Sequence, residues 1–153
     1  MEAIEATHKK VDTALKAGGD AVGAQTVIAT MPGQLPLACN NRLNELFVPM
    51  LIAEPNVAVK DAGHFSASTD MGDVSHLLPV IHPFIGGGDG FLHTADFHVV
   101  DFKHAVLLPA KAFAMMIVDL LADDAELARQ IKAEHHPLLT KEEYIAKLDK
   151  YFQ

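Results

Sequence analysis

The feature that most constrains this chain is a helix-length segment, residues 109–121, that is apolar on every side. Its apolar positions do not keep to one stripe; they are Ala112, Phe113, Met115, Met116, Ile117, Val118, Leu120 and Leu121. A helix of this kind is normally buried nearly all round, and we expect that here. The whole chain has 153 residues, the size of one ordinary domain, which leaves little polypeptide to cover such a helix.

Further helices are predicted on both sides of this segment. Residues 2–18 carry apolar side chains at helical spacing. Asn40 or Asn41 is a cap for a helix that runs to about residue 53, in which Pro49 should either cause a kink or mark the first turn. The turn-rich residues 66–70 begin a short helix that continues through residues 73–78.

Two helices are predicted near the C-terminus. Asp123 or Asp124 caps a helix that Pro137 ends. Thr140 and Glu143 have the spacing of a capping box, and the helix that follows them has an apolar face.

Three short segments are predicted as strands. Residues 25–30 are rich in β-branched side chains, residues 56–62 alternate apolar with polar positions, and residues 80–85 form a short apolar run. Strands that alternate with helices indicate the α/β class, here with a small mixed sheet flanked by helices. The Pro-rich residues 31–40 are the best candidate for a passage between two sub-structures.

Composition excludes several kinds of partner. The net charge is -8 with scattered basic residues, so neither nucleic acid nor an anionic membrane is expected to bind. Apolar runs fall short of the roughly 18–20 residues that a membrane span needs. Cys39 is the single cysteine, which excludes an internal disulfide and favours a reducing, cytoplasmic setting.

Histidines are numerous, and most of the nine lie between His64 and His104. His93 follows the Gly-rich residues 86–90 and precedes Asp96 by three positions. His93 is therefore a candidate zinc ligand, and the Asp96 carboxylate is a candidate to hold the other ring nitrogen of His93 by a hydrogen bond. The same spacing recurs between His98 and Asp101, so it is not specific. For any one of these histidines, a surface or hydrogen-bonded role is the ordinary alternative.

Other catalytic patterns are missing from the sequence. The Gly-rich loop lacks the Lys-Ser or Lys-Thr of a phosphate-binding loop, and there is no Gly-x-Ser-x-Gly elbow. Glu142 and Glu143 belong to the capping box, where a structural role is favoured. No residue of this chain is therefore assigned as catalytic.

Three segments, taken in order, carry a resemblance to a known family. They are residues 31–37 (Met-Pro-Gly-Gln-Leu-Pro-Leu), residues 68–83 (Ser-Thr-Asp-Met-Gly-Asp-Val-Ser-His-Leu-Leu-Pro-Val-Ile-His-Pro), and residues 92–97 (Leu-His-Thr-Ala-Asp-Phe) followed by 109–115. Together they resemble the C-terminal end of the aminoacylase and carboxypeptidase G-like metallopeptidases, peptidase family M-twenty. Within that family the resemblance is to the amidohydrolases similar to aminobenzoyl-glutamate utilisation protein B. It covers roughly residues 5 to 122.

The resemblance implies a di-zinc hydrolase of amide bonds, with a lid domain inserted into an α/β catalytic domain. Residues 1–31 would be the end of the lid, and residues 32–153 the C-terminal part of the catalytic domain. His93 matches the last metal ligand of the family. Ser68, Thr69 and Asp70 match the stretch that lines the substrate cleft.

The family's other ligands and its glutamate general base would lie in a part that precedes this sequence. The resemblance therefore implies a fragment of an enzyme for N-acyl amino acids, dipeptides or similar amides, inactive alone. Two alternatives stay open: a non-catalytic domain for metal binding or protein interaction, and one half of a split enzyme. Uncovered apolar surface predicts either self-association or binding to the missing N-terminal half.

Overall fold

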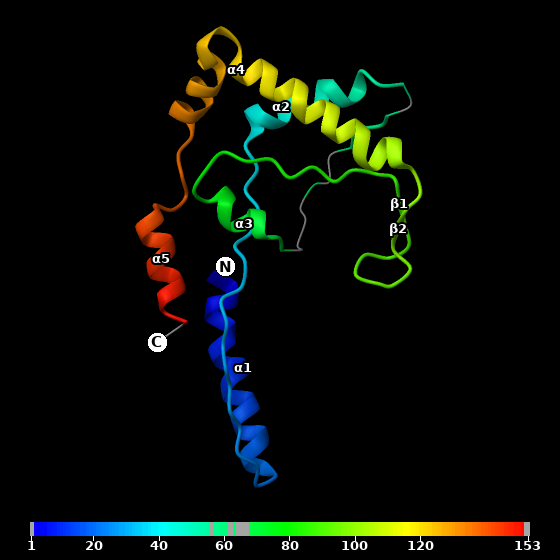
Figure 1. Ribbon diagram of the computed structural model, residues 1–153. Coiled ribbons are helices and arrows are strands. Elements are labelled where there is room, and N and C mark those ends of the chain that lie inside the picture. The colour runs from blue at the N-terminus through cyan, green and yellow to red at the C-terminus, as the bar shows by residue number, and fades with distance from the viewer. Residues whose placement is uncertain (1, 56, 61–62, 64–67, 152–153) are drawn as a thin grey trace.

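A computed structural model describes residues 2–55, 57–60, 63 and 68–151 of the chain, and Figure 1 shows its elements. Helices dominate and one very small sheet accompanies them, so the prediction of helices combined with a small sheet is confirmed. The prediction that the sheet is mixed is wrong for the described residues. The sheet has two strands, β1 (Gly88–Asp89) and β2 (His98–Val99), which pair antiparallel with Gly88 opposite Val99.

The first helix, α1, spans Glu2–Ala21 and confirms the prediction for residues 2–18, continuing past the Gly18-Gly19 pair. The chain then turns and runs back alongside α1, so that the two form an arm that projects from the rest of the molecule (Figure 1). Gly19 permits this return, because a methyl group there would lie only 2.0 Å from the hydroxyl oxygen of Thr26.

Residues 25–30 and 80–85 do not form the predicted strands. Neither segment is in a helix or a turn. A strand is stable only when a neighbour accepts and donates its backbone hydrogen bonds. The described part of the chain offers no such neighbour to either segment. Of the strand predicted at residues 56–62, residues 57–60 have no regular structure, and residues 56, 61 and 62 lie outside the described residues.

The second helix, α2 (Asn41–Ile52), confirms the prediction of a capped helix in this region. Asn40 is its cap, and the side chain of Asn40 accepts a hydrogen bond of 3.1 Å from the backbone N–H of Leu43. Pro49 lies inside the helix, so it does not mark its first turn. The backbone N–H of Asn40 donates to the carbonyl of Val80 at 2.7 Å, which joins the helix start to the 80–85 segment.

The core lies between α2 and α4, the long helix Leu108–Glu134 that follows a π-helical turn at Lys103–Leu107. Its buried members are apolar side chains from these two helices: Phe47, Met50, Leu51, Leu108, Ala112 and Met116. The ring of Phe113 packs on that of Phe47, with a centroid distance of 4.7 Å. Hydrophobic burial in the described residues is therefore concentrated along one side of α4.

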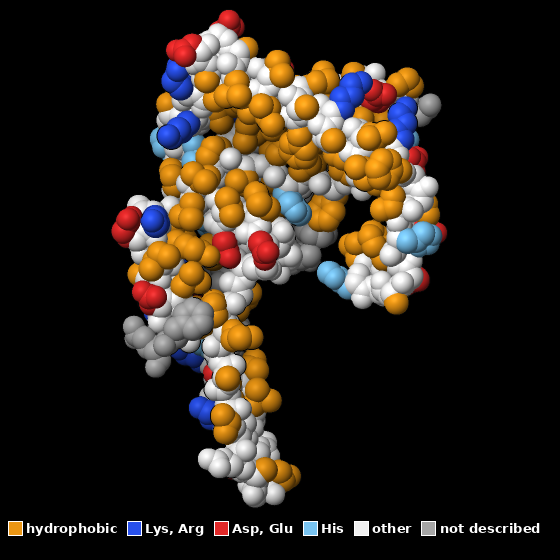
Figure 2. All heavy atoms as spheres, viewed as in Figure 1, with side chains coloured by type: hydrophobic (Ala, Val, Ile, Leu, Met, Phe, Trp, Pro, Cys, Tyr) orange, Lys and Arg blue, Asp and Glu red, His pale blue; other side chains and the backbone are white. Residues whose placement is uncertain are grey.

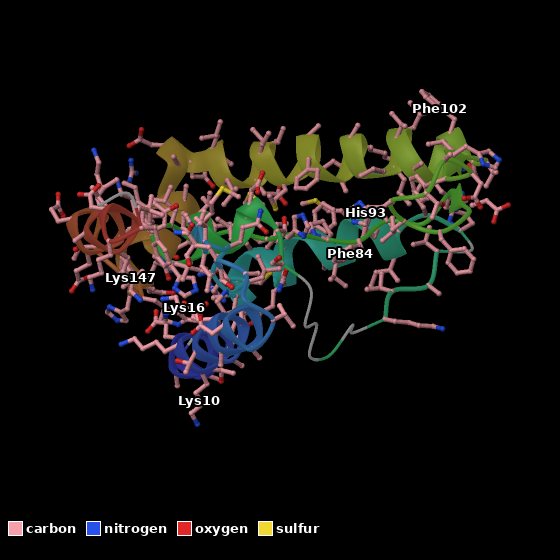
Figure 3. All side chains as sticks on the ribbon, turned by 90° about the horizontal axis from the view of Figure 1, so that it is seen from below. Lys10, Lys16, Phe84, His93, Phe102 and Lys147 are labelled. Carbon is pink, nitrogen blue, oxygen red and sulfur yellow. The ribbon has the colours of Figure 1, made fainter. Side chains whose placement is uncertain are left out.

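The expectation that residues 109–121 are buried nearly all round is wrong. Ile117, Val118 and Leu121 are 52%, 67% and 62% exposed. The reason is that α2 packs on one side of α4 only, and Figure 3 shows side chains on the opposite side pointing away from the rest of the molecule. By length and composition alone, the stretch Lys103–Glu134 could cross a membrane, which differs from the expectation that the apolar runs are too short. Core helices of soluble proteins meet the same criterion.

The helices predicted on either side of Asp123 form one long element with a break. Asp123, Asp124 and Ala125 have φ angles of 48°, 58° and 58°, so the chain turns sharply there before helix resumes. The helix ends at Glu134, ahead of Pro137 as predicted.

Helix α5 (Lys141–Asp149) begins at the predicted capping box. The Thr140 hydroxyl accepts from the Glu143 backbone at 3.1 Å, and the Glu143 carboxylate accepts from the Thr140 backbone at 2.7 Å. The short helix α3 (Asp70–Ser75) also forms, although it ends three residues before the expected Leu78.

Candidate functional site

His93, the predicted metal ligand, lies in the loop between β1 and β2. Its φ of 65° places it in the left-handed region, and its side chain is exposed. Gly90, with a φ of 86°, makes the loop possible, because a methyl group there would lie 2.7 Å from the carbonyl oxygen of Asp96. In Figure 3 the His93 side chain points from the hairpin toward the middle of the molecule, on the side of Phe84. The loop position agrees with the expectation for a ligand, but the described residues contribute no hydrogen bond to its ring.

Asp96, the predicted hydrogen-bond partner of His93, contacts a different residue. Its carboxylate accepts a hydrogen bond from the Thr94 hydroxyl. This hydrogen bond is the main reason why the pKa of the Asp96 carboxyl is lowered, and a hydrogen bond from the backbone N–H of Asp96 is the second reason. Its carbonyl oxygen accepts from Nδ1 of His98 at 2.7 Å. Asp96 thus holds the hairpin loop together, and a role in orienting His93 stays a prediction.

His98 and Asp101 form the second His-x-x-Asp pair, and their side chains do not bind each other either. Asp101 binds His104 instead: it accepts from the backbone N–H at 3.0 Å and from Nδ1 of the ring at 2.6 Å. These two hydrogen bonds lower the pKa of the Asp101 carboxyl, and the bond from the backbone N–H has the larger effect. The carboxylate starts the π-helical turn, so its role in the described structure is a cap.

The predicted cleft residues Ser68, Thr69 and Asp70 stand at the start of α3. Thr69 occupies the cap position without a side-chain cap bond, and Ser68 is exposed. The Asp70 carboxylate accepts a hydrogen bond from the side chain of Gln34. Asp70 therefore ties α3 to the connection that follows the arm, and its assignment to a substrate cleft stays a prediction.

Four further contacts join α3 to the same connection. Asp73 accepts from the backbone N–H of Leu35 at 2.8 Å, and the buried Ser75 accepts from the backbone N–H of Ala38 at 3.0 Å. Nε2 of His76 lies 2.9 Å from the carbonyl oxygen of Pro36. Gly72 completes the contact, because a methyl group there would lie 1.9 Å from the carbonyl oxygen of Leu35. Residues 70–76 thus hold the connection that follows the arm.

A zinc ion needs three or four ligands from His, Cys, Asp or Glu. Within the described ranges, no three such side chains are arranged to hold a metal ion. The resemblance assigns one ligand of the implied zinc site, His93, to this chain, and no catalytic step is assigned to a metal here.

Sequence reasoning missed a hollow of about 640 Å³ between α1, α3 and α5. Glu5 and Lys147 form an ion pair of 3.5 Å at its edge, and Asp73 and Tyr144 also line it. Burial raises the pKa of the Tyr144 phenol above its ordinary 10.0, and the nearby negative charge of Asp73 raises it further. These residues come from three distant parts of the chain, so no local pattern could have indicated the hollow.

Comparisons of this chain with protein-family models, curated proteins and solved structures found no match.

Proposed function

We propose that this chain is the C-terminal part of a metal-dependent amidohydrolase that acts on N-acyl amino acids, dipeptides or similar amides. One observation carries the proposal: residues 31–37, 68–83 and 92–97 resemble consecutive segments of such enzymes, in the same order.

In this proposal His93 is one metal ligand of the complete enzyme, and a preceding part supplies the other ligands and the general base. An exposed imidazole on a loop built around Gly90 is compatible with that role. The uncovered side of α4 supports the idea that a further part of the domain packs there.

A direct test has two arms. The purified chain, with zinc added, is expected not to hydrolyse a panel of N-acyl amino acids and dipeptides, because the described residues hold no metal group. Metal-dependent turnover by the chain alone, lost on His93→Ala, would contradict the proposal.

The second arm is a chimera. The chain replaces the corresponding C-terminal part of a complete enzyme of the family, downstream of the half that carries His-x-Asp and Glu-Glu. Metal-dependent hydrolysis is expected to return, to be abolished by His93→Ala, and to survive His136→Ala, a change at another exposed histidine. A chimera that is folded and binds metal, yet is inactive toward all these amides, would end the proposal.

A further inference from the structure

We propose that residues 122–125 form a hinge in α4, and that residues 126–151, the latch, close over α1 and α3 when the hinge is bent. The described structure is the bent state. Figure 1 shows the second part of α4 turning back from the first part and leading down to α5, beside the arm. In the other state α4 is straight, and the latch moves away from α1 and α3.

The backbone of the hinge is strained. Asp123, Asp124 and Ala125 have φ angles of 48°, 58° and 58°, and this left-handed conformation costs free energy at every residue that has a Cβ atom. The side chains of Asp123 and Asp124 are exposed, and Figure 2 shows charged side chains at the surface where α4 turns. The ion pair of Asp124 with Arg129 leaves 95% and 55% of these side chains exposed, so it adds little.

Strain of this kind persists only where other contacts of the fold hold it, and it is frequent in switch regions. The sequence around the hinge fits a straight helix as well as a bent one. Residues 120–134 contain no glycine or proline, and most of them are Ala, Leu, Glu, Arg, Gln or Lys, which favour helix. A straight α4 would therefore replace the left-handed residues by helical ones and relieve the strain.

Contacts of the latch hold the hinge bent. Ile131 is 3% exposed, and because a buried side chain touches many other residues, its burial depends on the packing of the latch. The backbone N–H of Leu139 donates to the carbonyl of His76 at 3.0 Å. Lys147 pairs with Glu5 at 3.5 Å, with both side chains partly exposed.

The strain and these contacts oppose each other. One buried apolar side chain, one backbone hydrogen bond and one exposed ion pair together stabilise the bent state by an amount of the same order as the strain at three residues. The loss of one strong contact is therefore enough to shift the balance toward the straight state.

Straightening would open the hollow between α1, α3 and α5. Helix α5 supplies Tyr144, Lys147 and Leu148 to its lining, so the hollow of about 640 Å³ has this wall only when the latch is closed. The hinge thus controls whether the hollow exists and whether α3 is covered.

The test measures one distance in the full chain by pulsed electron paramagnetic resonance. Cys39→Ser removes the single, exposed cysteine, and spin labels are attached through Ala110→Cys and Lys132→Cys, at exposed positions on either side of the hinge. In a straight helix the Cα atoms of residues 110 and 132 are roughly 33 Å apart, because the rise is about 1.5 Å per residue. The bent hinge gives a shorter distance.

Three variants set the balance. Ile131→Lys is expected to raise the ratio of straight to bent molecules by about tenfold or more, because an unpaired ammonium is costly at a buried position. Ile145→Lys, at an exposed apolar residue of α5, is the matched control and should leave the ratio unchanged. Adding Ala125→Gly to Ile131→Lys should lower the ratio again by about tenfold, because glycine adopts the left-handed conformation freely and disfavours helix.

The short distance alone in Ile131→Lys would overturn the proposal, and so would an equal shift in Ile145→Lys. A roughly 33 Å distance that Ala125→Gly does not reduce would also overturn it, since the strain of the hinge would then not matter. A broad distribution with a loss of helix in circular dichroism would show that the latch unfolds rather than swings, and this too would end the proposal.

Discussion

The carboxylate of Asp73 in α3 accepts a hydrogen bond of 2.8 Å from the backbone N–H of Leu35, across 38 positions of sequence. Leu35 is buried, so its N–H has little access to water as an alternative acceptor. This contact fixes the connection that follows the arm against the helix that begins at Asp70. The arm is therefore attached to the rest of the molecule through α3.

Replacing Asp73 by alanine is expected to destabilise the protein by about 1–3 kcal/mol, because it leaves the N–H of Leu35 without an acceptor. Urea unfolding measures the change. Asp119→Ala is the matched control, since Asp119 is exposed on α4, and it should change stability by no more than about 0.5 kcal/mol. Equal losses in both variants would show that the contact contributes nothing particular.

Two glycine-to-alanine changes are expected to act in opposite directions. Gly72→Ala brings a methyl group against the carbonyl of Leu35 and should cost about 1–3 kcal/mol. Gly18→Ala, in α1 with open space around it, should stabilise by about 0.5–1 kcal/mol because alanine favours helix. Thermal unfolding compares the two. A neutral Gly72→Ala would mean that α3 does not approach the connection this closely.

Acid should weaken the start of α5. Two hydrogen bonds from Thr140 hold the pKa of the Glu143 carboxyl below its ordinary 4.5. The bond from the backbone N–H has the larger effect, and the bond from the hydroxyl has the smaller one. Its stabilising contribution is therefore present above pH 4.5 and is lost as pH falls through the lowered pKa. Protection of the α5 amides from hydrogen exchange, taken relative to the intrinsic exchange rate at each pH, should fall over that range, and Glu143→Gln should remove most of this pH dependence. Exchange that is equally pH-dependent in Glu143→Gln would rule this out.

Alkali should weaken the contacts of Tyr144. Burial is the main reason why the pKa of its phenol is raised, and the negative charge of Asp73 is the second reason. The contribution of Tyr144 to the stability of the fold is therefore present below pH 10.0 and is lost as pH rises through the raised pKa. Tyr144→Phe is expected to remove this part of the fall in stability above pH 10.0. Ultraviolet titration of tyrosinate should also show that Asp73→Ala lowers the pKa of Tyr144. An unchanged titration in Asp73→Ala would contradict the assigned cause.

Local signals determined the helices well. The cap at Asn40, the capping box at Thr140 and Glu143, and the stop ahead of Pro137 are each confirmed. Each depends on hydrogen bonds or steric limits within a few residues of chain, so the sequence pattern contains all the necessary partners.

The predicted strands and the candidate site depend on distant partners, and there the sequence was a weaker guide. Residues 25–30 have the composition of a strand but no neighbouring strand among the described residues. Asp96 stands three positions from His93, yet its carboxylate binds Thr94. Spacing brings two side chains near each other, but the course of the loop decides which of them meet.

The sequence by itself determined that helices form in these regions, the caps of α2 and α5, and that one helix has apolar side chains on every side. Only the tertiary structure decided that α2 covers one side of α4 and leaves Ile117 and Leu121 exposed, and that Asp70 and Asp73 hold the connection at residues 34 and 35. The physical reason is the separation along the sequence between the groups that interact. Helix caps are satisfied within one turn, whereas burial and long-range hydrogen bonds require segments that only the folded chain brings together.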